Sequence, residues 1–282
     1  MNTQIQTCYR HSDRRAGVVC QRCDRPICPD CMRQASVGFH CPECTKQGAQ
    51  KIVRPQQLLN ARPLVTQALI AINVAIFAIG IGSGLETRPQ VAVDYGLIAE
   101  FTASDGFVFP GLGVAHGEWY RLLSSGFLHV NVIHIAFNML VLYQLGQLLE
   151  PVFGRLRFGV VYVVSLLCGS LGVMLVSPGN LTMGASGAVF GLMGFAFMAL
   201  RARGIDPFST GLGGTIVLNL IITFTLSRYI SVGGHVGGLI GGVACGWILT
   251  SAGPRYLKDN ALTLGVVVML GVVAGASAIL IA

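Results

Sequence analysis

Charged residues are scarce in this sequence. Asp, Glu, Lys and Arg make up 11% of its 282 residues, whereas about 25% is usual in a soluble domain. Apolar residues take their place, at 53% of the chain. This composition argues against an ordinary soluble enzyme. Intrinsic disorder and a small secreted disulfide domain are also poor fits, because two hundred residues of the chain are nearly uncharged and apolar.

Cysteine is almost absent from most of the chain and crowded at one end. Seven of the nine cysteines lie in the first 44 residues, and residues 1–62 also carry ten of the 19 basic residues but only four of the 12 acidic ones. The first 30 residues contain no apolar h-region, so we expect no secretory signal and a cytosolic N-terminus. Thiols stay reduced there, which favours metal ligation over disulfides.

Four pairs of potential metal ligands follow one another at the same spacing in residues 1–50. The pairs are Cys8 and His11, Cys20 and Cys23, Cys28 and Cys31, and Cys41 and Cys44. Eight ligands fill two tetrahedral zinc sites with none left over. Because only four residues separate Cys23 from Cys28, an interleaved pairing fits, with the first and third pairs on one ion and the second and fourth on the other. Sequential pairing stays open, and His40 is an alternative to Cys41.

The stretch resembles B-box and RING-like cross-brace zinc modules, on these ligands alone. Zinc ligated entirely by protein is structural, because a catalytic zinc keeps an open position for water. We expect a docking or regulatory module that recruits a cytosolic protein or fixes orientation against the inner leaflet. The arginines around the ligands are also compatible with nucleic acid. Positive charge on the cytosolic side follows equally from topology and anionic lipid, so we do not expect nucleic-acid binding.

Apolar stretches long enough to cross a bilayer follow a basic linker at residues 51–63. A transmembrane helix needs about 20 apolar residues, and the sequence predicts an all-α polytopic membrane protein. Its six-helix core covers residues 64–252, and one extra C-terminal helix lies within residues 253–282. The predicted spans are 64–82, 128–148, 157–177, 183–200, 212–230, 233–251 and 261–281.

Seven spans and a cytosolic start place the C-terminus outside the cell. The positive-inside rule agrees, because seven basic residues flank the predicted cytosolic ends and three lie outside. The cytosolic set is Arg62, Arg155, Arg157, Arg201, Arg203, Arg255 and Lys258, and the outer set is Arg88, Arg121 and Arg228. We therefore expect a multi-pass protein of the plasma (inner) membrane. The external segment at residues 83–127 is too long for a simple connection, and its apolar residues predict partial embedding.

Polar side chains inside a bilayer are costly, which makes them functional candidates. His134 and Asn138 are four residues apart in the second span and share one helix face, although such residues also serve as hydrogen-bonding contacts between helices. Ser186 begins the fourth span, where the free N–H groups of a helix N-terminus stabilise an oxyanion. His235 lies near the outer end of the sixth span.

Small residues would allow the fourth and sixth spans to pack closely. Gly234, Gly238, Gly242 and Gly246 repeat every four residues, and the fourth span has its own small face at Gly187, Gly191 and Gly194. Such faces permit close contact between helix backbones. If they meet, Ser186 and His235 come within hydrogen-bond distance, as a nucleophile with its general base. Spans two, four and six all run inward, so His134 lies at the same level.

These residues together resemble the rhomboid family of intramembrane serine proteases. The matching elements are Trp119 to Arg121, His129, His134, Asn138, Gly184-x-Ser186-Gly187 and His235-x2-Gly238-x3-Gly242. The resemblance implies that Ser186 is the nucleophile and His235 the base, and that His134, Asn138 and the Ser186 N–H form the oxyanion hole. His129 is then structural, and catalysis needs no cofactor. A helix added after the core resembles bacterial members.

Three positions depart from the family pattern. Phe190 stands where the family commonly has a tyrosine against the catalytic histidine, Gly234 replaces an alanine, and a tyrosine separates Trp119 from Arg121. None removes a reacting atom, so we expect cleavage of transmembrane proteins near the outer end of their spans. The alternative is a catalytically silent rhomboid-like protein that binds transmembrane helices. A transporter or channel is disfavoured, because the Asp, Glu, Lys and Arg residues of the membrane part all lie at or beyond helix ends and no inverted repeat is present.

Overall fold

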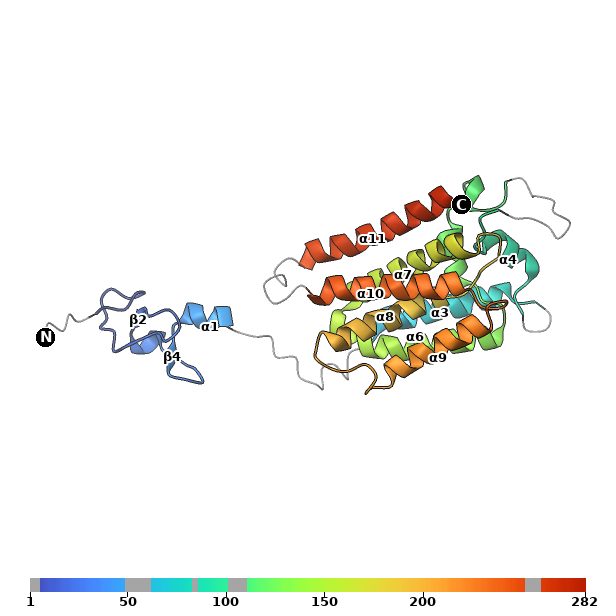
Figure 1. Ribbon diagram of the computed structural model, residues 1–282. Helices are drawn as coiled ribbons and strands as arrows, with labels where there is room; N and C mark the ends of the chain where they lie inside the picture. Colours follow the sequence, from blue (N-terminus) through green and yellow to red (C-terminus); the bar gives the residue numbers. More distant parts are fainter. Residues whose placement is uncertain (1–5, 49–61, 83–85, 101–110, 252–259) are drawn as a thin grey trace. The chain divides into compact units, whose positions relative to one another are not determined.

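The computed structural model describes residues 6–48, 62–82, 86–100, 111–251 and 260–282. The chain divides into two compact units, Met1–Gln57 and Leu58–Ala282, and each is described by itself (Figure 1). Most of the predicted linker at residues 51–63 lies outside the described residues, as do Arg255 and Lys258 of the predicted topology.

The first unit consists of two small hairpins and a short helix. Strand β1 (Val18–Val19) pairs with β2 (Pro26–Ile27), and β3 (Arg33–Gln34) pairs with β4 (Phe39–His40). A 3-10 turn, η1 (Pro29–Cys31), and helix α1 (Pro42–Gly48) complete it. Its buried cluster contains six cysteines and only one aliphatic side chain, that of Ile27. A unit this small needs bonds beyond its apolar contacts to remain folded.

The second unit is a bundle of seven long helices in the described part of the chain (Figure 1). The helices are α3 (Leu64–Gly80), α6 (Val132–Phe153), α7 (Arg155–Val176), α8 (Ser186–Arg201), α9 (Leu212–Thr225), α10 (Val232–Ser251) and α11 (Asn260–Ile281). Each corresponds to one predicted span. Helices α6, α7, α10 and α11 are long and apolar enough to cross a membrane, whereas α3, α8 and α9 are shorter apolar helices.

Two helices begin later than the sequence predicted, for local reasons. Helix α6 begins at Val132 rather than near residue 128, because the Asn131 side chain caps it by accepting a hydrogen bond from the His134 N–H. Helix α8 begins at Ser186 rather than 183, because Gly184 has a φ of 138° that no helix contains. Helix α9 ends at Thr225, five residues before the predicted end of its span.

Helix α10 packs against α8 through glycines, so the condition set by the small faces of the two spans is met. A Cβ atom added at Gly238 would overlap the carbonyl oxygen of Gly187, and one at Gly242 would overlap that of Gly191. The sequence did not predict a second glycine contact, in which Gly233 of α10 meets the backbone of Gly172 in α7. Helix α10 is thus held at backbone distance from two neighbours, because the residues that meet at these points have no side chains to separate the helices.

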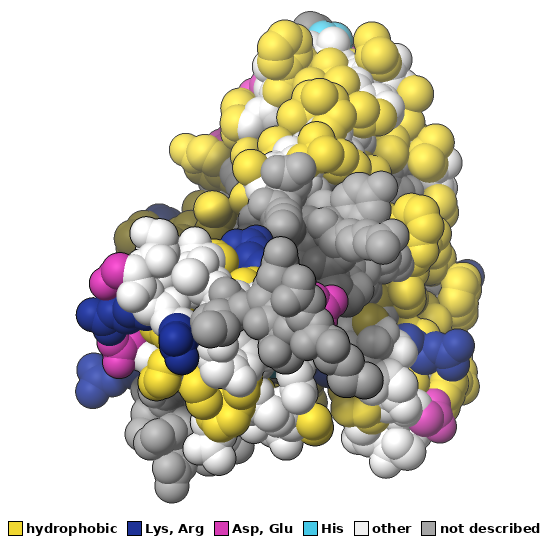
Figure 2. All heavy atoms as spheres, turned by 90° about the vertical axis from the view of Figure 1, so that its left-hand side faces the viewer, with side chains coloured by type: hydrophobic (Ala, Val, Ile, Leu, Met, Phe, Trp, Pro, Cys, Tyr) yellow, Lys and Arg dark blue, Asp and Glu magenta, His cyan; other side chains and the backbone are white. Residues whose placement is uncertain are grey.

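The outer surface of this bundle is apolar. Figure 2 shows hydrophobic side chains over the upper part of the visible face, where α11 lies in Figure 1. Large side chains on α11 that are more than half exposed include Leu262, Met269, Val272 and Leu280. Such a surface is unfavourable in water and suits the hydrocarbon of a bilayer. The chain is therefore a multi-pass membrane protein.

The external segment before α6 folds around a buried arginine. It contains α4 (Pro89–Tyr95), α5 (Arg121–Ser124) and two 3-10 turns, η3 (Val114–His116) and η4 (Ser125–Phe127). The Arg121 side chain is fully buried and donates to the Glu118 carboxylate at 2.7 Å and to the carbonyl oxygens of Val93 and Gly96. This residue therefore joins α4 to α5, which explains a buried cation at this position.

Candidate active site and metal clusters

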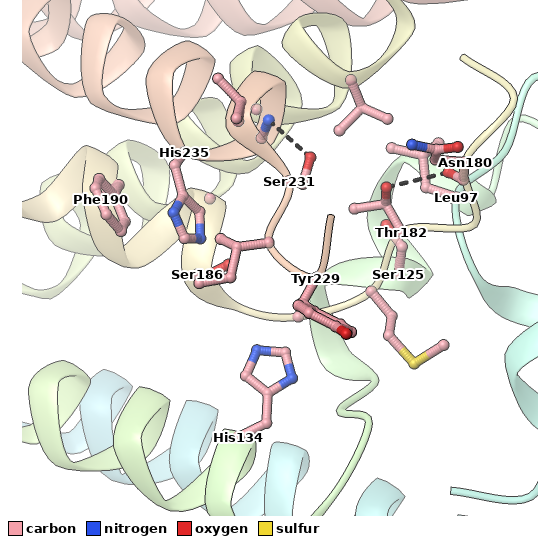
Figure 3. Close-up of a pocket in the computed structure, with 18 of the residues that line it drawn as sticks. Leu97, Ser125, His134, Asn180, Thr182, Ser186, Phe190, Tyr229, Ser231 and His235 are labelled. Carbon is pink, nitrogen blue, oxygen red and sulfur yellow. Dashed lines mark hydrogen bonds between the residues drawn. The ribbon is translucent and has the colours of Figure 1, made fainter. Parts of the chain in front are cut away.

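A cavity of about 1080 Å³ lies at the end of the helical unit where α6, α8 and α10 begin. Its lining includes His134 from the first turn of α6, Ser186 from the first turn of α8 and His235 from the first turn of α10. Figure 3 shows the Ser186 side chain between the rings of His235 and His134. Three helix N-termini, with their partial positive charge, thus converge on one cavity.

The loop before Ser186 is shaped by close contact with histidines. A Cβ at Gly184 would lie 2.8 Å from Cε1 of His134, so both this contact and its positive φ require glycine. The next residue, Ala185, donates its N–H to Nε2 of His129 at 3.4 Å. Ser186 itself is the first residue of α8, and its side chain is partly exposed in the cavity. The serine is therefore open to a substrate while its backbone is fixed.

The His235 ring is held between two side chains. It stacks on Phe190, with ring centroids 4.0 Å apart and an angle of 19° between the planes. Phe190 lies one turn after Ser186 in α8, so the stacking brings the ring toward the serine (Figure 3). On the other side, Nδ1 of His235 is 2.7 Å from the hydroxyl oxygen of Thr223 in α9. The sequence did not indicate Thr223, because a threonine inside an apolar span has no distinguishing pattern.

His134 presents a hydrogen-bond donor to the cavity. The Val130 N–H donates to its Nδ1 at 3.4 Å, so in the neutral ring the proton is on Nε2. That nitrogen is the one near Gly184. Asn138 also lines the cavity, and its amide donates to the His134 carbonyl at 2.9 Å, which leaves its second N–H for another acceptor. Two side-chain donors of α6 therefore stand near the serine.

Of the other residues that the resemblance singled out, Gly187 also lines the cavity, whereas Gly238, Gly242, Trp119 and Arg121 are not part of its lining. Gly238 and Gly242 form the contact between α8 and α10, and Gly187 lies opposite them at the start of α8. Arg121 is buried in the external segment, and Trp119 beside it is 57% exposed. Gly238 and Gly242 therefore serve helix packing, and Arg121 and Trp119 belong to the segment before α6 rather than to the cavity.

The eight ligands of the first unit form two clusters. One contains Cys8, His11, Cys28 and Cys31, and the other Cys20, Cys23, Cys41 and Cys44. This is the interleaved pairing, so sequential pairing is wrong, and His40 belongs to neither cluster. Within each cluster the ligand atoms lie within 4.8 Å of one another.

The spacing of these atoms fits tetrahedral zinc. Ligands about 2.3 Å from a central zinc lie about 3.8 Å from each other. The Sγ atoms of Cys23 and Cys41 are 3.8 Å apart, and so are Sγ of Cys8 and Nδ1 of His11.

A backbone hydrogen bond also acts on one of the thiols, because the Cys41 N–H donates to Sγ of Cys20 at 3.1 Å. Burial of this thiol raises its pKa, but backbone donors led by that of Cys41 outweigh burial and lower the pKa of Cys20 to about 6. Cys20 therefore favours the thiolate that metal binding requires, whereas hydrogen bonding with the Cys41 thiol raises the pKa of Cys44 in the same cluster to about 12.

Comparisons with known proteins agree on one family. A model of the rhomboid domain matches residues 116–252. The chain is 32% identical over 200 residues to rhomboid protease GluP of Bacillus subtilis (strain 168), covering 70% of this chain and 37% of that protein. It is 34% identical over 134 residues to the putative rhomboid protease YdcA of the same organism, covering 46% of this chain and 67% of that protein. Rhomboid-like protease 1 of Toxoplasma gondii is 34% identical over 150 residues, 51% of each chain.

Proposed function

Because this chain belongs to the rhomboid family, we propose that it is an intramembrane serine endopeptidase that cleaves transmembrane proteins near the outer end of their spans. The observation that carries the proposal is the cavity in which Ser186 lies between His235 and His134 (Figure 3). A hydroxyl beside an imidazole that is oriented by a third group is the arrangement of an activated nucleophile.

In the acylation step, the Ser186 oxygen attacks a substrate peptide carbonyl and its proton passes to Nε2 of His235. The carbonyl oxygen becomes an oxyanion. When the tetrahedral intermediate collapses, the C–N bond breaks and the leaving amine takes the proton from His235. The stacked Phe190 ring keeps the imidazole plane fixed through both transfers, since a ring held by packing needs no carboxylate to orient it.

The oxyanion is stabilised by donors that are already in place. We assign this role to Nε2–H of His134, the free N–H of the Asn138 amide and the Ser186 backbone N–H at the start of α8. Donors fixed before the reaction cost no reorganisation in the transition state, and each is worth roughly a hundredfold or more in rate. The convergence of three helix N-termini adds to the positive potential at this point.

The acyl-enzyme is then hydrolysed by water. His235 removes a proton from a water molecule as that water attacks the ester carbonyl, and the same proton returns to the Ser186 oxygen when the C–O bond breaks. The cavity contains polar side chains such as Asn131, Asn180 and Arg228 beside apolar ones. Polar groups of this kind hold water at a depth where lipid otherwise excludes it.

The length of α8 supports cleavage below the membrane surface. Its 16 residues rise about 24 Å, less than the roughly 30 Å hydrocarbon layer. With its C-terminus at the cytosolic side, an upright α8 places Ser186 inside the layer near the outer face. Substrates are then helices whose outer ends unwind easily, since a closed helix uses its own carbonyls. This orientation has the N-terminus in the cytosol and the C-terminus outside the plasma membrane.

We also propose that the two cysteine clusters hold two structural zinc ions. Zinc supplies the cross-links that the small apolar core of this unit lacks, and it takes no part in peptide hydrolysis. The module then serves as a docking or regulatory element, either for a cytosolic protein or against the inner leaflet.

Labelling with a fluorophosphonate probe tests the protease proposal without a known substrate. We expect the wild type to be labelled in detergent, and Ser186→Ala and His235→Ala to lose labelling by at least about a thousandfold, as for a disrupted nucleophile and base. Ser209→Ala, in an exposed loop after α8, is the matched control and should label like the wild type. If the folded wild type is not labelled, the silent, helix-binding alternative replaces the protease.

A further inference from the structure

Thr223 is a buried polar residue on a helix that is otherwise mostly exposed. Only Gly213, Ile216 and Thr223 are buried among the 14 residues of α9, and Thr223 is 1% exposed. Its hydroxyl oxygen has two partners, Nδ1 of His235 at 2.7 Å and the carbonyl oxygen of Asn219, one turn earlier, also at 2.7 Å. The hydroxyl therefore connects α9 directly to the ring that we assign as the base.

The Thr223 hydroxyl has a single hydrogen, so it can donate to only one of its two partners. A threonine hydroxyl carries one hydrogen and accepts with its lone pairs. The Asn219 carbonyl is an acceptor only, so the hydrogen must point to it if both contacts are hydrogen bonds. Thr223 then accepts from His235, which requires the proton of the neutral ring to be on Nδ1. This tautomer leaves the lone pair of Nε2 free.

From this geometry we propose that Thr223 is a positioning residue that fixes the tautomer and the orientation of His235. The inference rests on the proposed function, because it assigns the third group of the Ser186 and His235 arrangement. Phe190 fixes the plane of the ring, and Thr223 fixes its rotation within that plane. Nε2 is thereby directed to the cavity, which among the described residues is lined by His235 but not by Thr223.

The hydrogen bond between His235 and Thr223 becomes stronger during the acylation step. Once His235 takes the serine proton, the bond from Nδ1–H to the Thr223 oxygen becomes charge-assisted and roughly twice as strong as a neutral one. Thr223 then stabilises the imidazolium of the transition state more than the neutral ring of the resting enzyme. A neutral hydroxyl does in part what a carboxylate does in soluble serine proteases, without placing a charge inside a bilayer.

The test compares Thr223→Val with Thr223→Ser by fluorophosphonate labelling of the full chain. Valine keeps the shape but removes the acceptor, and loss of one hydrogen bond of about 1.4 kcal/mol corresponds to a rate about tenfold lower. We expect this loss in the maximal labelling rate, with the half-saturating probe concentration unchanged. Serine restores the acceptor and should label within about twofold of the wild type.

Thr215→Val is the matched control. Thr215 lies two turns earlier on α9 and bonds the Gly211 carbonyl at 3.0 Å in the same manner, but it is exposed and does not contact His235. It should label at the wild-type rate. If Thr223→Val fails to fold, as judged by its thermal unfolding, Thr223→Ala replaces it with the same expectation.

The outcomes separate this inference from the proposed function. A wild type that is not labelled contradicts the protease itself. A labelled wild type with Thr223→Val equally fast contradicts only the role of Thr223. If Thr223→Ser is as slow as Thr223→Val, the methyl group matters and the hydroxyl does not, which also overturns the inference.

Discussion

The two units of this chain obtain close packing by opposite means. In the first unit, side chains converge, and eight ligand atoms from four separate turns form two tight clusters. In the helical unit, side chains are missing where packing is closest, and the backbones of α7, α8 and α10 meet at glycines. The comparison shows that a short chain in water needs added bonds, whereas a bundle in lipid gains from allowing its backbones to approach.

Metal removal should have the largest effect on stability, and it should unfold the first unit while leaving the helical unit intact. Structural zinc contributes about 10–16 kcal/mol of folding free energy at pH 7, so a strong chelator should unfold the first unit completely. We expect about two zinc ions to be released per chain and seven cysteines to become reactive toward a thiol reagent, from the two clusters. Zinc analysis and thiol titration provide the measurements.

The helical unit should not respond to the same chelator. Both tryptophans of the chain, Trp119 and Trp247, lie in it, so their fluorescence reports on this unit alone. Their emission and the fluorophosphonate labelling rate should stay unchanged. A parallel loss of labelling would show that the zinc module is part of the catalytic unit. It would contradict the view that the two units are stabilised independently.

A single methyl group added at the glycine contact between α8 and α10 should cause the second largest loss of stability. Gly242→Ala places a Cβ against the Gly191 carbonyl, and overpacking of this kind costs about 1–3 kcal/mol. The displacement of α10 from α8 should also slow labelling, because Ser186 and His235 are on these two helices. Thermal unfolding followed by tryptophan fluorescence measures the first effect.

Gly265→Ala is the control for that substitution. Gly265 lies in α11 with nothing within 4 Å of an added Cβ, so alanine should be neutral or raise stability by its better helix propensity. Equal unfolding temperatures for the two variants would mean that the α8–α10 contact has room to expand.

The smallest effect should come from the polar contacts outside the bundle core. Partial burial raises the pKa of Glu118, but the Gly113 N–H and Arg121 outweigh it and hold the pKa below its usual 4.5. The charged carboxylate therefore stabilises the fold above pH 4.5, and this contribution is lost as pH falls through the lowered pKa.

Glu118→Gln should thus be less stable than the wild type by about 1 kcal/mol near neutral pH, because glutamine keeps an acceptor for the buried Arg121 but makes the hydrogen bond neutral, and the difference should shrink as the pH falls below 4.5. Trp119, its neighbour, is the fluorescent reporter. Glu86→Gln, an exposed carboxylate without an ion pair among the described residues, should show no such trend. A difference that grows in acid would contradict the assigned contact.

The sequence predicted the elements well because their signals are local. Apolar runs marked each long helix of the second unit, and the Cys-x2-Cys spacing marked each ligand pair. It also placed His134, Ser186 and His235 at one level, since the direction of alternate spans follows from counting them. Errors arose at helix ends, where the Asn131 cap and the φ of Gly184 decided the first residue.

The sequence by itself determined which residues could serve as ligands, spans, nucleophile and base. Only the tertiary structure decided which ligand pairs share a cluster, that α10 has a second glycine face toward α7, and that Thr223 reaches Nδ1 of His235. Spacing along a chain specifies which side chains share a turn or a helix face. Which faces meet depends on packing between segments far apart in sequence, and there a threonine hydroxyl gains a partner that no local pattern reveals.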